Sequence, residues 1–438
     1  MRSGEIYRTT IVGFLFFFLI AANNLIKIAR DSVFLGHHSV SELPYLYILV
    51  ALTAGTVIAL YARVTATLTV SRLILLTYAI VFLNIIFFWL LITYLNPGWS
   101  HYAFFVWSAI TGAITVAQAW TFVHQVFTKE EGERLFGLIM AGGTVGGTAA
   151  AFGAKWALEN SIESIDLLWP VAGCLSAASV LVSYATRESI IKVVGHELEQ
   201  ERKSNTGKFS GVVVFLSRSG YLRTITLLIL VSVIVSSLID FEFKAAAKET
   251  YPSQQALAGF FASYYGWLSI LTFIIQVFLS VTRLSRLGLF PSHYLTPAFL
   301  LTGSVVMVIS PSLLAATVTR ITDSILRNSI HRRGIELLYI PLPTRLRKTV
   351  KPFLDVVGER VGDATAGVMI LLVSFFAANG YVATVHFINM GLLLAWILLI
   401  PVLRVAYTST IRRHTRSPSS FSAERLQEGQ SSRQSFRL

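Results

Sequence analysis

Cysteine and charged residues are both scarce in this sequence. The 438 residues include one cysteine, Cys174, so neither an internal disulfide nor a multi-cysteine metal site can form. Only 13% of the residues are charged, whereas 54% are hydrophobic. The charged fraction is about half that of an ordinary soluble domain, which excludes a water-soluble globule. Because long apolar runs also exclude a disordered chain, the composition indicates an integral membrane protein.

The sequence also lacks the motifs of most enzymes and cofactor sites. It contains no GxxxxGK[ST] phosphate loop and no recognisable pairing of a nucleophile with a base. His37 and His38 have no acidic or cysteine cluster beside them, so we expect no metal site there. Glycines cluster instead at small-xxx-small spacing, which lets a helix approach a neighbour closely: Gly142, Gly143, Gly146 and Gly147. We predict a protein that is not an enzyme, with no catalytic residues, metal or cofactor.

Twelve apolar segments are each long enough to cross a bilayer as a helix, which takes about 20 residues. They cover about residues 9–35, 43–62, 71–94, 101–127, 136–158, 165–186, 221–246, 256–281, 290–309, 312–338, 352–377 and 382–406. Transmembrane β-barrels show short alternating segments instead. The sequence therefore predicts an all-α integral membrane protein with twelve transmembrane helices.

The basic residues indicate how these helices are oriented. If both termini are cytoplasmic, 28 of the 36 Lys and Arg fall in inside segments, and only Arg30 and Lys248 fall in outside connections. Because Lys and Arg concentrate in cytoplasmic loops, we expect cytoplasmic termini. A separate expectation is that the membrane is a bacterial inner membrane. This placement accounts for most of the net charge of +13. We therefore expect no nucleic-acid partner.

The two halves of the chain resemble each other at an offset of about 216 residues. Residues 144–150 (TVGGTAA) then fall on 360–366 (RVGDATA). Six spans per half are typical of two pseudo-symmetric bundles of the major-facilitator kind, which expose a midplane site to either side in turn. We predict an N-terminal six-helix bundle, a cytoplasmic linker, a C-terminal six-helix bundle and a basic, disordered tail that lies on anionic lipid. Their respective bounds are 1–186, 187–220, 221–407 and 408–438.

The tenth span carries three charged residues on one face. Arg320, Asp323 and Arg327 follow i, i+3, i+7 spacing. A charge deep in the bilayer costs at least about 3 kcal/mol, so each of these residues should face a partner or a wet cavity. We favour a position facing the central cavity. An ion pair between helices that never meets substrate is the alternative.

The first and seventh spans carry charged clusters nearer the outside. The first span has Lys27, Arg30 and Asp31, and the seventh has Asp240 and Lys244 at i, i+4 spacing. Each lysine could reach the headgroups instead, and Asp240 with Lys244 could form a pair that locks a gate. A binding role and a structural role therefore stay equally open for these clusters.

The eleventh span is rich in acids. Asp355, Glu359 and Asp363 share one face. The helix dipole is sufficient to explain Asp355, which begins the helix, whereas Asp363 lies about three turns in and is the best candidate for a coupling carboxylate. The residues that we assign to coupling or gating are Asp31, Asp240, Asp323, Glu336, Glu359, Arg360 and Asp363.

Several segments resemble the ATP/ADP translocase family of nucleotide transporters. They are residues 240–244 (DFEFK), 336–343 (ELLYIPLP), 351–363 (KPFLDVVGERVGD) and 42–45 (ELPY). The resemblance implies twelve helices and exchange of ATP for ADP, or of related nucleotides with phosphate. It also implies basic residues in the first, seventh and tenth helices that hold the phosphates, which by position are Lys27, Lys244 and Arg327. Our substrate-binding set adds Arg30 and Arg320.

The buried charges themselves agree with an anionic substrate, because Arg forks onto phosphate oxygens and Lys acts as a point charge. Nucleotide antiport is our first hypothesis. The alternative is a proton-coupled major-facilitator transporter of another organic anion, metabolite or drug. A third hypothesis, from another class, is a membrane module that recruits partners through its basic tail without transport. We expect the bilayer as surroundings and no obligate protein partner.

Overall fold

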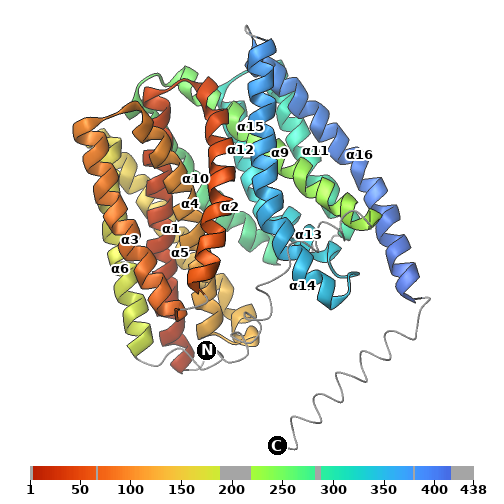
Figure 1. Cartoon of the computed structure of the whole chain (residues 1–438), viewed down its shortest axis with the longest axis horizontal. Helices are drawn as coiled ribbons and strands as arrows, with labels where there is room; N and C mark the ends of the chain where they lie inside the picture. Colours follow the sequence, from red (N-terminus) through yellow and green to blue (C-terminus); the bar gives the residue numbers. More distant parts are fainter. Residues whose placement is uncertain (1–2, 66–67, 188–218, 282–287, 378–379, 416–438) are drawn as a thin grey trace, which may run out of the picture.

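The computed structural model describes residues 3–65, 68–187, 219–281, 288–377 and 380–415, which are helical with no β-strand (Figure 1). The helices of the first half are α1 (Ser3–His37), α2 (Leu43–Thr65), α3 (Val70–Leu90), α4 (Gly98–Val126), α5 (Lys129–Glu159) and α6 (Leu168–Arg187). Those of the second half are α9 (Gly220–Thr250), α10 (Gln254–Val281), α11 (Leu289–Ile309), α12 (Leu313–Leu326), α15 (Glu359–Phe376) and α16 (Tyr381–Thr415).

Ten helices in the described part are long and apolar enough to cross a membrane. The other two, α12 and α15, are extended by neighbouring helical turns. α12 continues through a π-helical turn, η5 (Arg327–His331), into α13 (Arg332–Leu338). α15 is preceded by α14 (Thr344–Phe353) and a π-helical turn, η6 (Leu354–Gly358). The prediction of an all-α membrane fold with twelve spanning helices is confirmed.

Several helices extend further than the sequence indicated. α9 runs to Thr250, so Lys248, which was counted in an outside connection, lies inside a helix. α1 runs to His37, so Arg30 lies inside a helix with 13% of its side chain exposed and not in an outside connection, as its count among the outside cations implied. α16 runs to Thr415, so residues 408–415 of the expected tail are helical. The remainder of that tail, 416–438, and residues 188–218 of the expected linker lie outside the described residues.

The internal repeat of the sequence is visible in the packing of glycine-bearing helices. A Cβ atom on Gly146 of α5 would collide with the backbone carbonyl of Phe17 on α1. A Cβ atom on Gly362 of α15 would lie 2.6 Å from a side-chain atom of Val233 on α9. Both members of the second pair stand 216 positions after those of the first. Each half therefore uses the same small-residue approach between equivalent helices, as small residues do in membrane bundles.

The two halves meet through two symmetry-related sets of contacts. α10 packs against α1 and α5, and α15 packs against α2. The second and eighth spans, α2 and α10, are equivalent in a two-fold repeat, as are the fifth and eleventh, α5 and α15. One pairing is therefore the counterpart of the other. The start of α1 and the end of α16 lie at the same end of the molecule (Figure 1), which we call the terminal face.

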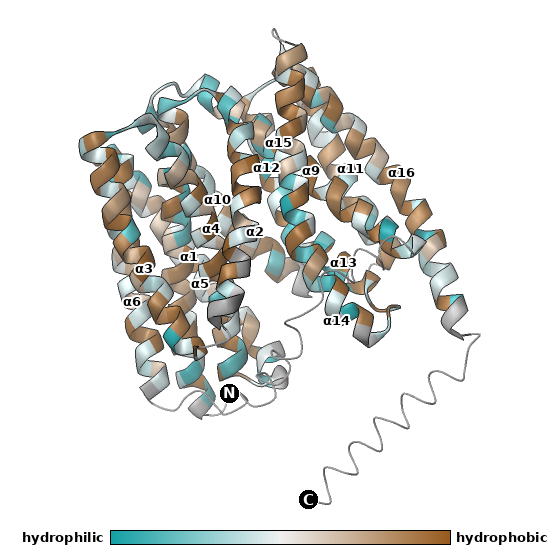
Figure 2. Ribbon diagram, in the orientation of Figure 1, coloured by the Kyte–Doolittle hydropathy of each residue, from teal (hydrophilic) through white to brown (hydrophobic). Residues whose placement is uncertain are grey.

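The helices of both halves consist largely of hydrophobic residues (Figure 2). Large apolar side chains such as Leu83, Phe375 and Leu398 are between 66% and 81% exposed. Exposure on this scale is unfavourable in water but suits contact with lipid tails. Apolar side chains therefore cover the outside, and charged side chains gather between the halves.

Candidate functional site

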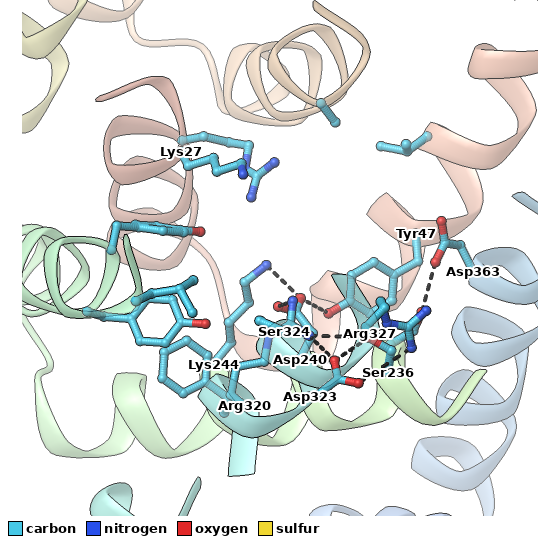
Figure 3. Close-up of a pocket in the computed structure, with 18 of the residues that line it drawn as sticks. Lys27, Tyr47, Ser236, Asp240, Lys244, Arg320, Asp323, Ser324, Arg327 and Asp363 are labelled. Atoms are coloured by element: carbon cyan, nitrogen blue, oxygen red, sulfur yellow. Dashed lines mark hydrogen bonds and ion pairs between the residues drawn. The ribbon is translucent and has the colours of Figure 1, made fainter. Parts of the chain in front are cut away.

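A cavity of about 390 Å³ lies between the two halves of the chain (Figure 3). This volume falls in the range of about 300–1,000 Å³ that is typical of small-molecule sites. Residues from α1, α2, α4, α9, α10, α12, α15 and η5 line it. Its polar and aromatic lining consists of Lys27, Arg30, Tyr47, Phe105, Ser236, Ser237, Asp240, Phe243, Lys244, Tyr264, Tyr265, Arg320, Asp323, Ser324, Arg327, Asn328 and Asp363.

The helical spacing of α12 brings its charged residues to this cavity together. Arg320 and Asp323 are one turn apart, and Arg327 follows one turn later at the start of the π-helical turn η5. All three line the cavity, as predicted from their shared face. π-helical turns occur frequently at functional sites. Here the turn places Arg327 on the cavity wall.

The network of charges begins at Asp31, whose side chain is 1% exposed. The guanidinium group of Arg30 donates two hydrogen bonds to this carboxylate, at 2.9 and 3.1 Å. The hydroxyl of Tyr265 donates a third at 3.0 Å. The ammonium of Lys244 lies 3.5 Å from it. Since Tyr265 and Lys244 belong to the C-terminal half, this carboxylate of α1 links the two halves.

Asp240 on α9 forms the second centre of the network. It binds the ammonium of Lys244 at 2.9 Å and the guanidinium of Arg320 at 2.9 Å. The hydroxyl of Tyr47, on α2, donates a hydrogen bond to it at 3.0 Å. Asp240 is therefore held by both halves too, and the expected pair with Lys244 is present.

Asp323 forms the third centre, with a side chain that is 1% exposed. Arg320 donates to one carboxylate oxygen at 2.8 Å, and the hydroxyl of Ser236 donates to the same oxygen at 2.6 Å. The other oxygen lies 3.5 Å from Arg327. Acid and base thus alternate from α1 through α9 to α12: Arg30, Asp31, Lys244, Asp240, Arg320, Asp323 and Arg327. Figure 3 shows the α9 and α12 part of this series.

Positive charge exceeds negative charge on the cavity wall. Five basic side chains line the cavity against three carboxylates. Lys27 makes no ion pair with any described residue, and its ammonium lies 5.7 Å from the centre of the Tyr265 ring. Arg327 donates to the carbonyl of Ser232 at 2.6 Å, yet its Nε atom is buried without a hydrogen-bond partner in the described structure. Lys27 and Arg327 therefore have hydrogen-bond donors available for a bound anion.

Aromatic rings lie beside the cations. The Phe105 ring is 4.5 Å from the Arg30 guanidinium carbon and 5.4 Å from the Lys244 ammonium. The sequence analysis missed Phe105, Tyr47 and Tyr265, because aromatics make up 12% of the chain and none stands out by spacing. Such rings can support cations through their faces and can also stack on a planar ligand group.

Three of the predicted coupling residues lie in the eleventh span, α15, but they differ in their position relative to the cavity. Asp363 lines the cavity and accepts a hydrogen bond from Ser237 at 2.8 Å. Arg360 is not part of the lining but donates to Asp363 at 3.3 Å. Glu359 is exposed and outside the lining. Asp363 is therefore the member of this group that a cavity ligand can contact.

Glu336 is not brought to the cavity. It lies on α13 and binds the ammonium of Lys351, on α14, at 2.7 Å. The two side chains are 47% and 34% exposed. Glu336 therefore forms an ion pair away from the cavity, and a coupling role at the cavity has no geometric basis for this residue.

Comparison with known proteins gives a consistent family match. The family model described as TLC ATP/ADP transporter matches residues 90–407. The chain is 22% identical over 331 residues to ADP,ATP carrier protein 1 of Chlamydia pneumoniae. It is 24% identical over 305 residues to ADP,ATP carrier protein 4 of Rickettsia prowazekii (strain Madrid E). These matches cover 66% and 61% of this chain, and 64% and 59% of the carriers, which is less than two thirds of their length.

Solved structures with the same fold are transporters of the major-facilitator kind. A crystal structure of a mutant of the nucleoside transporter NupG superposes with a TM-score of 0.63. The match covers 92% of this chain and 100% of that one, at 11% sequence identity. At this identity the likeness supports the fold alone.

Proposed function

Because the chain belongs to the TLC ATP/ADP transporter family, we propose that it exchanges nucleotides of the ATP and ADP type across a membrane by alternating access. The observation that carries the proposal is the excess of basic side chains around one cavity between the two halves. A polyphosphate supplies the negative charge that this wall lacks. We further propose a bacterial inner membrane with cytoplasmic termini, and bundles at 1–186 and 221–407 joined by a linker at 187–220.

In this proposal the phosphates first meet the cations that have capacity to spare. Lys27 and Arg327 can donate hydrogen bonds to phosphate oxygens without giving up a strong carboxylate contact. Arg30 and Arg320 are already bound to carboxylates at 2.8 to 2.9 Å. These two arginines can bind phosphate only if they share their donors between carboxylate and phosphate or release the carboxylate. This competition favours a bound anion of high charge over a weakly charged one.

The same network gives a reason for exchange. Three of its contacts join the halves directly: Lys244 to Asp31, Tyr265 to Asp31, and Tyr47 to Asp240. Such contacts hold the two halves together in the absence of substrate. A phosphate that competes for Lys244 weakens one of them, so the change of access follows substrate binding. A carrier that moves only when loaded exchanges one substrate for another.

The rings of Phe105, Tyr264 and Tyr265 support a nucleotide in particular. They line the same cavity as the cations, so a ligand with phosphates at one end and a planar base at the other meets both kinds of side chain. A small inorganic anion uses only the charged part.

Reconstituted vesicles test this function. Vesicles loaded with ADP should take up labelled ATP, whereas empty vesicles should not, and Arg327→Gln should abolish the uptake. Glu336→Gln serves as the matched control, because its carboxylate lies outside the cavity. Failure of the loaded vesicles to exchange ATP, ADP, GTP or phosphate in any pairing would remove the proposal.

A proton-coupled carrier of another organic anion is the second candidate, and Asp363 favours it. This carboxylate lines the cavity and has an Arg360 contact as long as 3.3 Å. Uptake that collapses with the proton gradient and in Asp363→Asn, without any need for internal substrate, would support this candidate over exchange.

A further inference from the structure

A second buried polar cluster lies within the C-terminal half, outside the cavity. Its centre is Glu242 on α9, two residues after Asp240, with 3% of its side chain exposed. Glu242 is absent from the cavity lining. One carboxylate oxygen lies 3.2 Å from Nδ1 of His386, and the other accepts a hydrogen bond from the amide of Asn389 at 3.4 Å. Both partners are on α16.

The contacts of His386 fix the position of one proton. Its Nε2 atom lies 3.0 Å from the backbone carbonyl of Ser304 on α11. A carbonyl oxygen can only accept, so Nε2 carries a hydrogen atom. The Nδ1 atom faces a carboxylate oxygen, and two lone pairs at 3.2 Å would repel. A proton must therefore lie between Nδ1 and Glu242, on either atom, and the pair holds one proton more than a carboxylate beside a neutral imidazole.

Among the described residues, no cation other than this proton contacts the Glu242 carboxylate. α11 presents the carbonyl of Ser304, and α16 presents the amide of Asn389. On α9 the flanking charges Asp240 and Lys244 are bound in the cavity network. Loss of the proton would leave an uncompensated buried carboxylate, which is strongly unfavourable. Occupancy by the proton therefore decides how stably α9 and α16 pack together.

Polar side chains continue from this pair along one face of α16. His386, Asn389 and Trp396 follow i, i+3, i+10 spacing, which places them on one side of the helix. The distance along the helix axis from His386 to Trp396 is about 15 Å, at about 1.5 Å per residue. The ring centres of Trp396 and His331 are 5.2 Å apart, and those of His331 and His293, on α11, are 6.3 Å apart. Two polar groups therefore lie along this face: His386 and Asn389 near the start of α16, and Trp396 with His331 and His293 nearer the terminal face.

The ring nitrogens of His293, His331 and Trp396 have no hydrogen-bond partner among the described residues. Both nitrogens of His293 and of His331 are buried without one, as is Nε1 of Trp396, and the three residues are at most 4% exposed. A neutral imidazole always carries one donor, and buried donors are satisfied by protein or by internal water. This cluster therefore suits a short hydrated path.

We propose that Glu242 and His386 form a proton-binding site, separate from the anion cavity, that exchanges its proton along the polar face of α16 during transport. The proton itself follows from the contacts of His386. Its coupling to transport rests on the function proposed above. A link to the cavity exists in η5, which begins with Arg327 on the cavity wall and ends with His331 in the polar group nearer the terminal face.

Infrared difference spectroscopy on the lipid-reconstituted protein tests the site without any substrate. Titration from about pH 5 to about pH 9, across the ordinary range of imidazole, should show carboxyl and imidazole bands that change in one step. Glu242→Gln and His386→Gln should each remove that step. Asp363→Asn, which alters the cavity carboxylate, should keep it. A step that persists in Glu242→Gln would overturn the proposal.

Glu242→Gln should fold well, because the glutamine amide can donate to Nδ1 of a neutral His386. Vesicles that contain a pH-sensitive dye and ADP, mixed with external ATP, then test the coupling. Wild-type exchange should move protons, and Glu242→Gln should keep exchange but lose the proton signal. An unchanged proton signal in Glu242→Gln would overturn the proposal. Absence of ATP exchange in the wild type would overturn the proposed function and the coupling, while the infrared titration would still decide the proton site.

Discussion

Two cations on opposite walls of the cavity, Lys27 and Arg320, are held differently. On the N-terminal wall, Lys27 has only the Tyr265 ring beside it and no acidic partner among the described residues. On the C-terminal wall, Arg320 binds both Asp240 and Asp323. A cation bound to acids must change partners before it can hold an anion, whereas a cation without them can bind at once. Lys27 is therefore suited to first contact with an anion, and Arg320 to the structural response.

The largest effect is expected from the C-terminal wall. Arg320→Ala removes the shared partner of Asp240 and Asp323 and leaves two carboxylates short of a cation. Loss of one member of a buried ion pair costs about 3 kcal/mol or more, so the unfolding temperature in detergent should fall steeply. A lysine at this position can keep one of the two carboxylate contacts, so the unfolding temperature of Arg320→Lys should fall less. An unfolding temperature unchanged in Arg320→Ala would show that the network contributes nothing to stability.

The N-terminal wall should give the reverse pattern. Lys27→Gln breaks no ion pair among the described residues, so the unfolding temperature should stay the same. It should weaken ATP binding by about 2 kcal/mol, or about thirtyfold, because a hydrogen bond to a charged group contributes about that much. Isothermal titration measures this affinity. If Lys27→Gln destabilised the fold while ATP affinity held, the contrast between the walls would be reversed.

The hydroxyls that join the halves should have a smaller and matched effect. Tyr265→Phe removes the donor to Asp31, and Tyr47→Phe removes the donor to Asp240. Each change should cost about 1.5 kcal/mol, the lower end of the range for a hydrogen bond to a charged group, measured by thermal unfolding. A loss confined to one of the two variants would mean that only one carboxylate joins the halves.

The smallest effect is expected outside both walls. Glu336→Gln breaks an exposed ion pair with Lys351, and such pairs contribute about 0.2–1 kcal/mol. Its unfolding temperature and its ATP uptake should both match those of the wild type. A clear loss of uptake would place a coupling group near α13 and α14 and would restore the role predicted from sequence.

Sequence alone was sufficient for features that depend on local periodicity. The helices follow from apolar length, and the shared face of Arg320, Asp323 and Arg327 follows from helical spacing. Contacts between distant helices did not follow. The Tyr265 hydroxyl meets Asp31 across 234 positions, and His386 meets Glu242 across 144. Such pairs depend on how helices pack, for which spacing along one helix carries no information.

Lining the cavity and forming an ion pair are compatible roles for a buried charge. For Arg320, Asp323 and Arg327, the sequence predicts these two roles as alternatives. The structure shows both at once, because the residues that line the cavity are also bound to one another. Charge pairing lowers the cost of burial in the membrane and still leaves a net positive wall.

Recognition of a polyphosphate by the cavity is tested by a thermal-shift series with adenosine, AMP, ADP and ATP on the purified protein. Ligands that bind the folded state raise its apparent stability by mass action. Since the positive wall is the proposed recognition element, stabilisation should rise with the number of phosphates and should be largely lost in Lys27→Gln. Equal stabilisation by adenosine and ATP, or none by ATP, would contradict a cavity built to hold a polyphosphate.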